Sequence, residues 1–263
     1  MALPDAICSS IEKALEMIRK LFTAAAMTAI ALTPACAQDS PSSGINRAEV
    51  EEIVREYILA NPEIIEDALI VLSEKQRAEA ADAAKVAIRK EKDKLYSLAS
   101  DHFVGPADAE VTVVEFFDYR CGFCKRSVDT IQALPAQYDG KVRVVFKELP
   151  IFGGISETAA LAALAAGKQD KYNEMHIALM EIKSNDDLTE KRIDSIAESI
   201  GISVQKMRAD MKSMEIQKQL ADMKDLGRTL GVGGTPGFFV GETHIEGADM
   251  AKLDAAIKAE LEG

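Results

Sequence analysis

One stretch of this chain decides its fold: VTVVEFFDYRCGFC, residues 111–124. Its first half, residues 111–117, is almost wholly apolar, which predicts a strand buried on both faces. Cys121 and Cys124 follow at the point where we expect a helix to begin. The helix N-terminus favours the thiolate of the first cysteine, and the second lies one turn away, where it can resolve a mixed disulfide. The pattern therefore indicates thiol–disulfide chemistry, with Cys121 attacking and Cys124 resolving.

The N-terminus reads as a secretory signal peptide, residues 1–37. Two basic residues, 19–20, precede an apolar run, 21–32, that is too short to span a bilayer comfortably. Small residues at 35 and 37 predict cleavage after Ala37, so Cys8 and Cys36 leave with the peptide. A lipid anchor on Cys36 is the competing interpretation, but Thr33 fits it poorly. We therefore expect a periplasmic protein that keeps only Cys121 and Cys124.

Other uses of the CxxC are less favoured. A disulfide that closes so short a loop removes little unfolded-chain entropy, so it is a poor structural staple. A zinc site needs further ligands, and the three histidines do not lie at ligand spacing: His102, His176 and His244. We expect no cofactor and no resident metal, although two thiolates can hold Cu(I), so copper handling stays open as a secondary role.

The charge of the chain narrows the class of partner. The formal net charge is −12, which argues against nucleic acid and against an anionic membrane surface. We therefore expect protein partners that carry thiols or disulfides.

A helical extension is predicted over residues 46–100, after a flexible leader at 38–45. Asn46 is a plausible N-cap with Glu49 three positions on, and apolar stripes follow on both sides of the helix break at residues 61–62. The polar run 89–94 is expected to be solvated. Either these stripes pack back onto the chain's own domain, or they bury against copies of themselves in an oligomerisation arm, which is the interpretation we favour.

The remaining residues, 101–263, predict an α/β domain. Strands at 111–117 and 142–146 flank a helix from 121 to about 134, which makes a right-handed βαβ unit. A helical block follows at about 156–230, and then two short strands and a last helix at 249–261. This order predicts a thioredoxin-like fold with an inserted helical subdomain, preceded by the all-helical extension.

Three segments give the chain a family resemblance: EFFDYRCGFC at 115–124, FKELP at 146–150 and GGTPGFFV at 233–240. Over residues 101–263 the chain resembles the DsbA-like thiol–disulfide oxidoreductases. Within that family, the helical extension and the CxxC interior resemble the suppressor-of-copper-sensitivity (ScsC) subfamily. Some members of that subfamily trimerise through such an extension and act as disulfide isomerases.

The resemblance implies further site residues. It implies a cis peptide at Thr235-Pro236 beside the CxxC, with the Thr235 backbone pairing with an extended substrate. Glu115, an acid inside a central strand, matches the family's buried carboxylate, which takes a proton from the resolving thiol. The alternative interpretation is that Glu115 occupies a half-exposed strand position.

The neighbours of these site residues are expected to be bystanders. Either Lys147 and Glu148 tune the same charge cluster, or they are exposed charges at a strand end, which is the interpretation we favour. We expect Tyr172 and His176 to be packing residues rather than catalytic ones.

The CxxC interior, Gly122-Phe123, tunes the redox state. It lacks the imidazole of the strongly oxidising relatives, so we expect a Cys121 pKa within about 3.5–7, away from the acidic extreme, and a potential less oxidising than about −120 mV. This favours a disulfide isomerase or reductase, reset by a membrane redox partner. The rivals are a monomeric dithiol oxidase and a copper-binding or holdase protein without turnover.

Overall fold

The computed structural model describes residues 46–96 and 99–263, which fall into two units divided after Pro62. The predicted signal peptide and leader lie outside the described residues. The first unit contributes one described helix, α2 (Arg47–Ala60), and buries none of its residues. Asn46 caps α2 in the predicted capping box, since its side chain accepts from the Ala48 N–H and its own N–H donates to Glu49.

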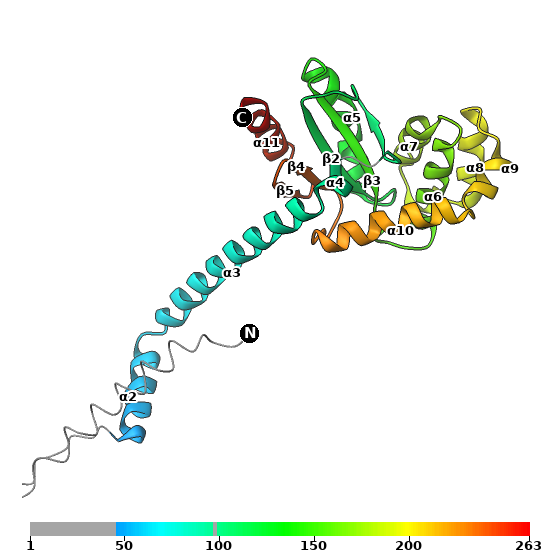
Figure 1. Ribbon diagram of the computed structural model, residues 1–263. Coiled ribbons are helices and arrows are strands. Elements are labelled where there is room, and N and C mark those ends of the chain that lie inside the picture. Colours follow the sequence, from blue (N-terminus) through cyan, green and yellow to red (C-terminus); the bar gives the residue numbers. More distant parts are fainter. Residues whose placement is uncertain (1–45, 97–98) are drawn as a thin grey trace, which may run out of the picture. The chain divides into compact units, whose positions relative to one another are not determined.

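The second unit is a thioredoxin-like α/β domain with one five-stranded sheet (Figure 1). Its strands lie in the order β1-β3-β2-β4-β5, with β2 and β3 parallel and the other pairs antiparallel. The strands are β1 (His102–Val104), β2 (Val111–Phe117), β3 (Val142–Glu148), β4 (Gly237–Val240) and β5 (Thr243–Glu246).

Helices cover both faces of this sheet and form the insert between β3 and β4. The insert comprises α6 (Ile155–Gly167), α7 (Tyr172–Met180), α8 (Glu190–Ser199), α9 (Val204–Asp210) and α10 (Met214–Thr229). The other helices are α3 (Glu63–Lys90), α4 (Lys92–Tyr96), α5 (Gly122–Gln137) and α11 (Met250–Glu262). In Figure 1, α6 to α9 gather beside β1 and β3, and α11 lies beside β4 and β5.

Alternation along β2 sends its side chains into two separate cores. Val113 and Phe117 pack with α5, α11 and the insert, whereas Val114 and Phe116 pack with Leu226 of α10 and the end of α3. Both faces are covered, as the apolar run predicted. Glu115 belongs by alternation to the α5 face.

Helix α3 is attached to the domain only at its C-terminal end. Ile88 is its one buried residue, and Leu95 of α4 joins the same core. The Tyr96 hydroxyl donates to the Gly241 carbonyl at 2.7 Å, and Arg89 pairs with Glu242 at 2.7 Å. Further up α3 the apolar side chains are exposed: Ile65, Leu69, Ile70, Val71, Leu72 and Val86. The alternative in which this part of the stripe packs back onto its own domain is therefore wrong.

One sequence expectation near this attachment needs correction, and one strand was missed. The polar run 89–94 is not wholly solvated, because Glu91 is buried and forms an ion pair with Lys94 at 2.6 Å. Strand β1 was not predicted, since three residues are too few to show a period of two.

Across residues 46–96 and 99–263, no helix is both long and apolar enough to cross a membrane.

Candidate active site

The CxxC lies where β2 ends and α5 begins. Cys121 is the N-cap of α5, and its sulfur accepts the backbone N–H of Cys124 at 3.4 Å. Unpaired N–H groups and the positive end of the helix dipole converge there, so a thiolate takes the place that an N-cap oxygen usually holds. Both cysteines are free thiols in this structure, 5% and 1% exposed.

The two thiols differ sharply in acidity. A hydrogen bond from the Cys124 thiol lowers the pKa of Cys121 to about 5 against the opposing effect of burial, and the Thr235 side chain and the backbone N–H groups of Cys124 and Phe123 lower it further. Burial raises the pKa of Cys124, and the hydrogen bond to Cys121 and the charge of Glu115 raise it further. Near neutral pH the pair therefore holds one thiolate, on Cys121, and one proton, on Cys124. The pKa of Cys121 falls within the expected span.

Glu115 is buried, with 2% of its surface exposed, so the alternative of a half-exposed strand position is wrong. It lies between Phe146 of β3 and Phe238 of β4 in the sheet register. Desolvation raises its pKa to about 8, and the Cys121 thiolate adds to the effect. A carboxyl group with this pKa can both hold and accept a proton near neutral pH.

The segment before β4 supplies the second half of the site. The Thr235-Pro236 peptide is cis, which confirms that prediction. The Cys121 thiol donates to the Thr235 carbonyl oxygen at 3.1 Å, a contact available only while the sulfur is protonated. The Thr235 side-chain oxygen is buried, and this side chain helps to lower the pKa of Cys121. The structure thus brings Cys121, Cys124, Glu115 and Thr235-Pro236 together.

Lys147 and Glu148 are both buried, so the expectation of exposed strand-end charges was wrong. Glu148 accepts from the hydroxyls of Tyr119 and Tyr172, each at 2.9 Å, and Tyr119 also meets Nδ1 of His176 at 3.3 Å. Desolvation raises the pKa of Glu148 well above its ordinary value. Tyr172 and His176 are packed in the core, as expected, but they also join this hydrogen-bonded group.

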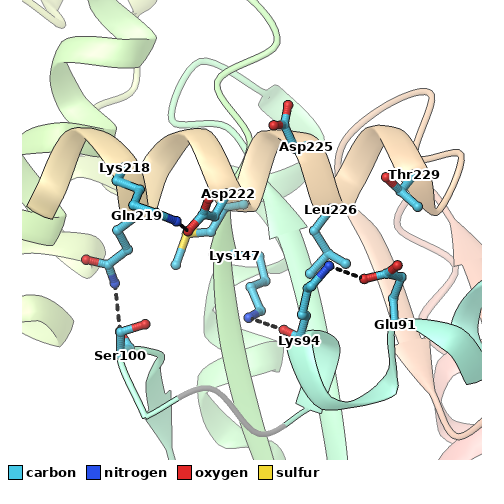
Figure 2. Close-up of a pocket in the computed structure, with 11 residues that line it drawn as sticks. Glu91, Lys94, Ser100, Lys147, Lys218, Gln219, Asp222, Asp225, Leu226 and Thr229 are labelled. Carbon is cyan, nitrogen blue, oxygen red and sulfur yellow. Dashed lines mark hydrogen bonds and ion pairs between the residues drawn. The ribbon is translucent and has the colours of Figure 1, made fainter. Parts of the chain in front are cut away.

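Lys147 points to the opposite face of the sheet, where Figure 2 shows it beside a cavity of about 350 Å³. Its ammonium group donates to the Lys94 carbonyl at 2.9 Å and to Asp101 at 2.6 Å. The cavity lies between α10 and the segment around residues 91–100, and it contains none of the predicted site residues. Lys147 therefore fastens the segment that follows α3 to the domain.

Asp118 was missed by the sequence reasoning. It is buried, and its two oxygens accept from the Arg120 N–H at 2.7 Å, the Phe152 N–H at 3.1 Å and the Ser156 hydroxyl at 2.8 Å. It thereby ties the turn before Cys121 to the loop that follows β3. An acidic residue between a doubly buried strand and a CxxC was the signal that could have found it.

The interior residues of the CxxC are exposed to solvent. Phe123 is 58% exposed, and the Arg126 guanidinium lies 4.4 Å from its ring centroid. Over the described ranges, no group of three or more His, Cys, Asp and Glu side chains is placed to hold a metal ion.

Comparison with known proteins agrees with this geometry. A thioredoxin family model matches residues 97–259, and the model of the copper resistance protein ScsC N-terminal domain matches residues 46–79. The chain therefore belongs to the thioredoxin family, in its DsbA-like group of thiol–disulfide oxidoreductases, and its layout is that of ScsC.

Solved structures of similar proteins include a linker-deletion variant of Proteus mirabilis ScsC, which is 28% identical with a TM-score of 0.61. That match covers 84% of this chain and 99% of the other. The thiol-disulfide exchange protein α-DsbA2 of Wolbachia pipientis is 30% identical with a TM-score of 0.62, and the match covers 68% of this chain and 96% of that one.

Curated relatives fall into two kinds. A probable disulfide bond formation protein D of Bacillus anthracis is 28% identical over 66% of this chain and 86% of its own length. The Na⁺/H⁺ antiporter NhaA 3 of Salinispora tropica is 31% identical over 60% of this chain, but the match spans only 24% of that protein. The chain thus spans about a quarter of the antiporter's length.

Proposed function

We propose that this chain is an exported enzyme that exchanges thiols and disulfides in protein substrates, most of all a disulfide isomerase or reductase. The observation that carries the proposal is the contrast between the two thiols at the start of α5. The pKa of Cys121 is lowered to about 5, while that of Cys124 is raised. One sulfur is thereby ready to attack, and the other keeps its proton until it is needed.

The reaction begins when the Cys121 thiolate attacks one sulfur of a substrate disulfide. A Cys121–substrate disulfide forms, the substrate S–S bond breaks, and the second substrate sulfur leaves as a thiolate. The Cys124 sulfur then gives up its proton and attacks Cys121, which releases the first substrate sulfur as a thiolate. The substrate gains two electrons and the CxxC loses two. When a substrate thiolate performs the second attack instead, the disulfide is rearranged and no net electron transfer occurs.

Glu115 is the proposed acceptor of the Cys124 proton. Its pKa is raised partly by the Cys121 thiolate, and that charge disappears when Cys121 enters the mixed disulfide. Glu115 then ionises more easily, at the step in which Cys124 must lose its proton. Thr235, whose carbonyl oxygen lies 3.1 Å from the Cys121 sulfur, is the proposed backbone partner of an extended substrate, with Pro236 beside it.

Isomerisation is favoured over oxidation by two features. Gly122-Phe123 provides no imidazolium to stabilise the Cys121 thiolate further, so part of the enzyme can stay reduced and attack wrong disulfides. The helical extension leaves its apolar residues exposed within each unit, which supports an oligomer with several dithiols. A membrane redox partner is proposed to reset the dithiol after reduction of a substrate.

Export is supported by a relative described as a periplasmic thioredoxin-like protein from Salmonella enterica, 25% identical with a TM-score of 0.58. We propose the periplasm as the location, after cleavage behind Ala37. The mass of the N-terminal peptide from protein exported by a Gram-negative host tests the cleavage position directly.

The decisive experiment uses a protein whose disulfides have been scrambled and measures the recovery of its activity. The chain from Gln38 onward is expected to restore activity, and Cys121→Ser is expected to abolish exchange because oxygen cannot replace the attacking thiolate. A monomer that oxidises a reduced substrate rapidly but does not unscramble would identify the rival oxidase. Unchanged function in Cys121→Ser would identify a copper-binding or holdase protein.

A further inference from the structure

Two exposed aromatic rings lie near the Cys121 turn. Phe123 lies two residues after Cys121 and is 58% exposed, and Phe152, in the loop after β3, is 53% exposed. Asp118 accepts both the Arg120 N–H and the Phe152 N–H, which ties the loop that carries Phe152 to the turn before Cys121. Exposed rings beside a reactive sulfur are typical of a contact surface for a partner.

An arginine guanidinium group lies over each of the two rings. The Arg126 guanidinium lies 4.4 Å from the centroid of Phe123, and that of Arg120 lies 5.7 Å from the centroid of Phe152. A cation over one face of an aromatic ring leaves its outward N–H groups available to a carboxylate. The rings and arginines together thus offer apolar area and anion-binding donors in the same place.

The cations around Cys121 form no ion pair with a carboxylate in the described part of the chain. Among the ion pairs of the described residues, none includes Arg120, Lys125 or Arg126. The Lys125 ammonium is held by neutral acceptors, the Ile182 carbonyl at 2.6 Å and the Asn185 amide oxygen at 3.0 Å. Asp118 is close by, but it is buried and its oxygens already accept three hydrogen bonds.

Nearby basic residues behave differently. Lys224 pairs with Glu157 at 3.4 Å, and Arg228 pairs with Asp225 at 2.9 Å. The whole chain carries a formal net charge of −12, so three cations outside any ion pair beside the nucleophile depart locally from the sign of the chain. Such cations steer negative groups of a partner toward the reactive sulfur.

We propose that Arg120, Lys125 and Arg126, with the rings of Phe123 and Phe152, form a cationic rim that selects extended protein segments bearing acidic and aromatic residues next to the cysteine. This inference rests on the proposed exchange at Cys121 and names its preferred substrate. The aromatic side chain of the segment contacts the rings, and its carboxylates bind the arginines. The cysteine sulfur then meets Cys121.

The test measures the first exchange step with the reduced, otherwise unaltered chain. Three synthetic peptides of equal length carry one cysteine, activated as a mixed disulfide with neutral 4-thiopyridine, next to one phenylalanine. They differ only in the two flanking residues, which are Glu, Gln or Lys. Attack by Cys121 forms the Cys121–peptide disulfide and releases the thiopyridine, which is followed by absorbance. At low salt the Glu peptide is expected to react roughly fivefold faster than the Gln peptide, and the Lys peptide slower than both.

Variants assign the preference to the rim. Arg126→Gln is expected to lose about half or more of the Glu preference, measured as the ratio of the rate with the Glu peptide to the rate with the Gln peptide. Lys141→Gln is the matched control, because Lys141 precedes β3 at the opposite end of the parallel strands and pairs with Glu110. Alkylation by neutral iodoacetamide checks that Cys121 itself is equally reactive in both variants. High salt is expected to reduce the preference of the unaltered chain for the Glu peptide over the Gln peptide.

The outcomes separate the inference from the function on which it rests. Equal rates for the three peptides, or a faster Lys peptide, would overturn the rim's role while leaving exchange intact. A failure of every peptide to react would instead overturn the proposed function. A peptide of residues 47–60, rich in glutamate, is added in excess as competitor. Slowing by that peptide would assign the rim to a second copy of this chain and overturn the substrate assignment.

Discussion

At the scale of single residues, the chemistry of the active site depends on side chains whose pKa values are shifted from their ordinary values. Cys121 loses its proton well below neutral pH, while Cys124 and Glu115 keep theirs because they are desolvated. The hydrogen-bonded group around Glu148 is buried beside them, with two tyrosine hydroxyls satisfying one carboxyl oxygen. These groups make the chemistry of the dithiol depend on pH.

We predict that alkylation of the reduced chain by iodoacetamide follows a single ionisation with a midpoint near pH 5, because hydrogen bonds to sulfur favour the Cys121 thiolate. The Cys124→Ala variant should shift this midpoint upward, since the Cys124 thiol supplies the largest of those hydrogen bonds. The measurement is the alkylation rate from pH 3 to 9. A wild-type midpoint between pH 8 and 9, where a free thiol ionises, would contradict the proposed nucleophile.

Glu115→Gln is predicted to stabilise the reduced protein at pH 8–9, and by much less at pH 4. The pKa of Glu115 is raised to about 8 in the folded state, so the unfolded state binds fewer protons than the folded state between about pH 4.5 and 8. Stability is therefore lost as pH rises through that window. The neutral amide avoids this loss, for a gain of roughly 2–4 kcal/mol. Urea unfolding of both proteins at equal concentration over this pH range checks the sign, and a difference independent of pH would refute it.

At the scale of secondary-structure elements, the site is built where separate segments meet. The CxxC opens α5, the cis Thr235-Pro236 peptide precedes β4, and the loop after β3 is tied to the CxxC turn through Asp118. Neither the loop nor the turn has regular secondary structure to fix it. Asp118 is therefore the residue that relates them.

Asp118→Ala is predicted to cost about 2–3 kcal/mol of unfolding free energy, because two backbone N–H groups and a buried hydroxyl lose their acceptor. The loop carrying Phe152 should also become more accessible to proteolysis. Asp129→Ala is the control, since Asp129 is exposed on α5. Denaturation and limited proteolysis measure both effects, and equal stability of the two variants would show that Asp118 does not fasten the loop.

At the scale of the whole molecule, the proposed role of the helical extension is to set the number of dithiols that act together. Helix α2 buries none of its residues, and α3 buries only Ile88. Most of the exposed apolar residues of α2 and several of those in α3 repeat at helical spacing, which is the pattern of an association surface: Val50, Ile53, Val54 and Tyr57 in α2, and Ile65, Leu69 and Leu72 in α3. An oligomer would place several Cys121 thiolates around one misfolded substrate.

We predict that Ile53→Lys raises the dissociation constant of this oligomer about tenfold or more, because the apolar stripe of α2 then carries a charge. Leu59→Lys is a closely matched control: Leu59 is equally apolar and 70% exposed, but it lies on the opposite face of the helix from Val50. Light scattering over a dilution series gives the molar mass, and the same samples are assayed for unscrambling. A wild-type chain that is monomeric at all concentrations would rule out the arm.

The sequence predicted much of the fold because its signals are local. The run 111–117 and the CxxC directly after it placed β2 and α5, and Asn46 with Glu49 placed the start of α2. Strand β1 escaped detection because a strand of three residues has no readable period, and its place is decided by pairing with β3. Lys147 and Glu148 were misjudged because charged residues at a strand end are ordinarily solvated.

By itself, the sequence determined the chemistry of this protein: an attacking and a resolving sulfur one helical turn apart at a helix N-terminus, a position that local backbone geometry dictates. Only the tertiary structure decided which ionisable side chains are desolvated. Helix α7 covers Glu148, the two neighbouring strands and α5 enclose Glu115, and the segment after α3 covers Lys147, all of them brought together from distant parts of the chain. Burial is a non-local property, and a pKa raised by desolvation depends on it.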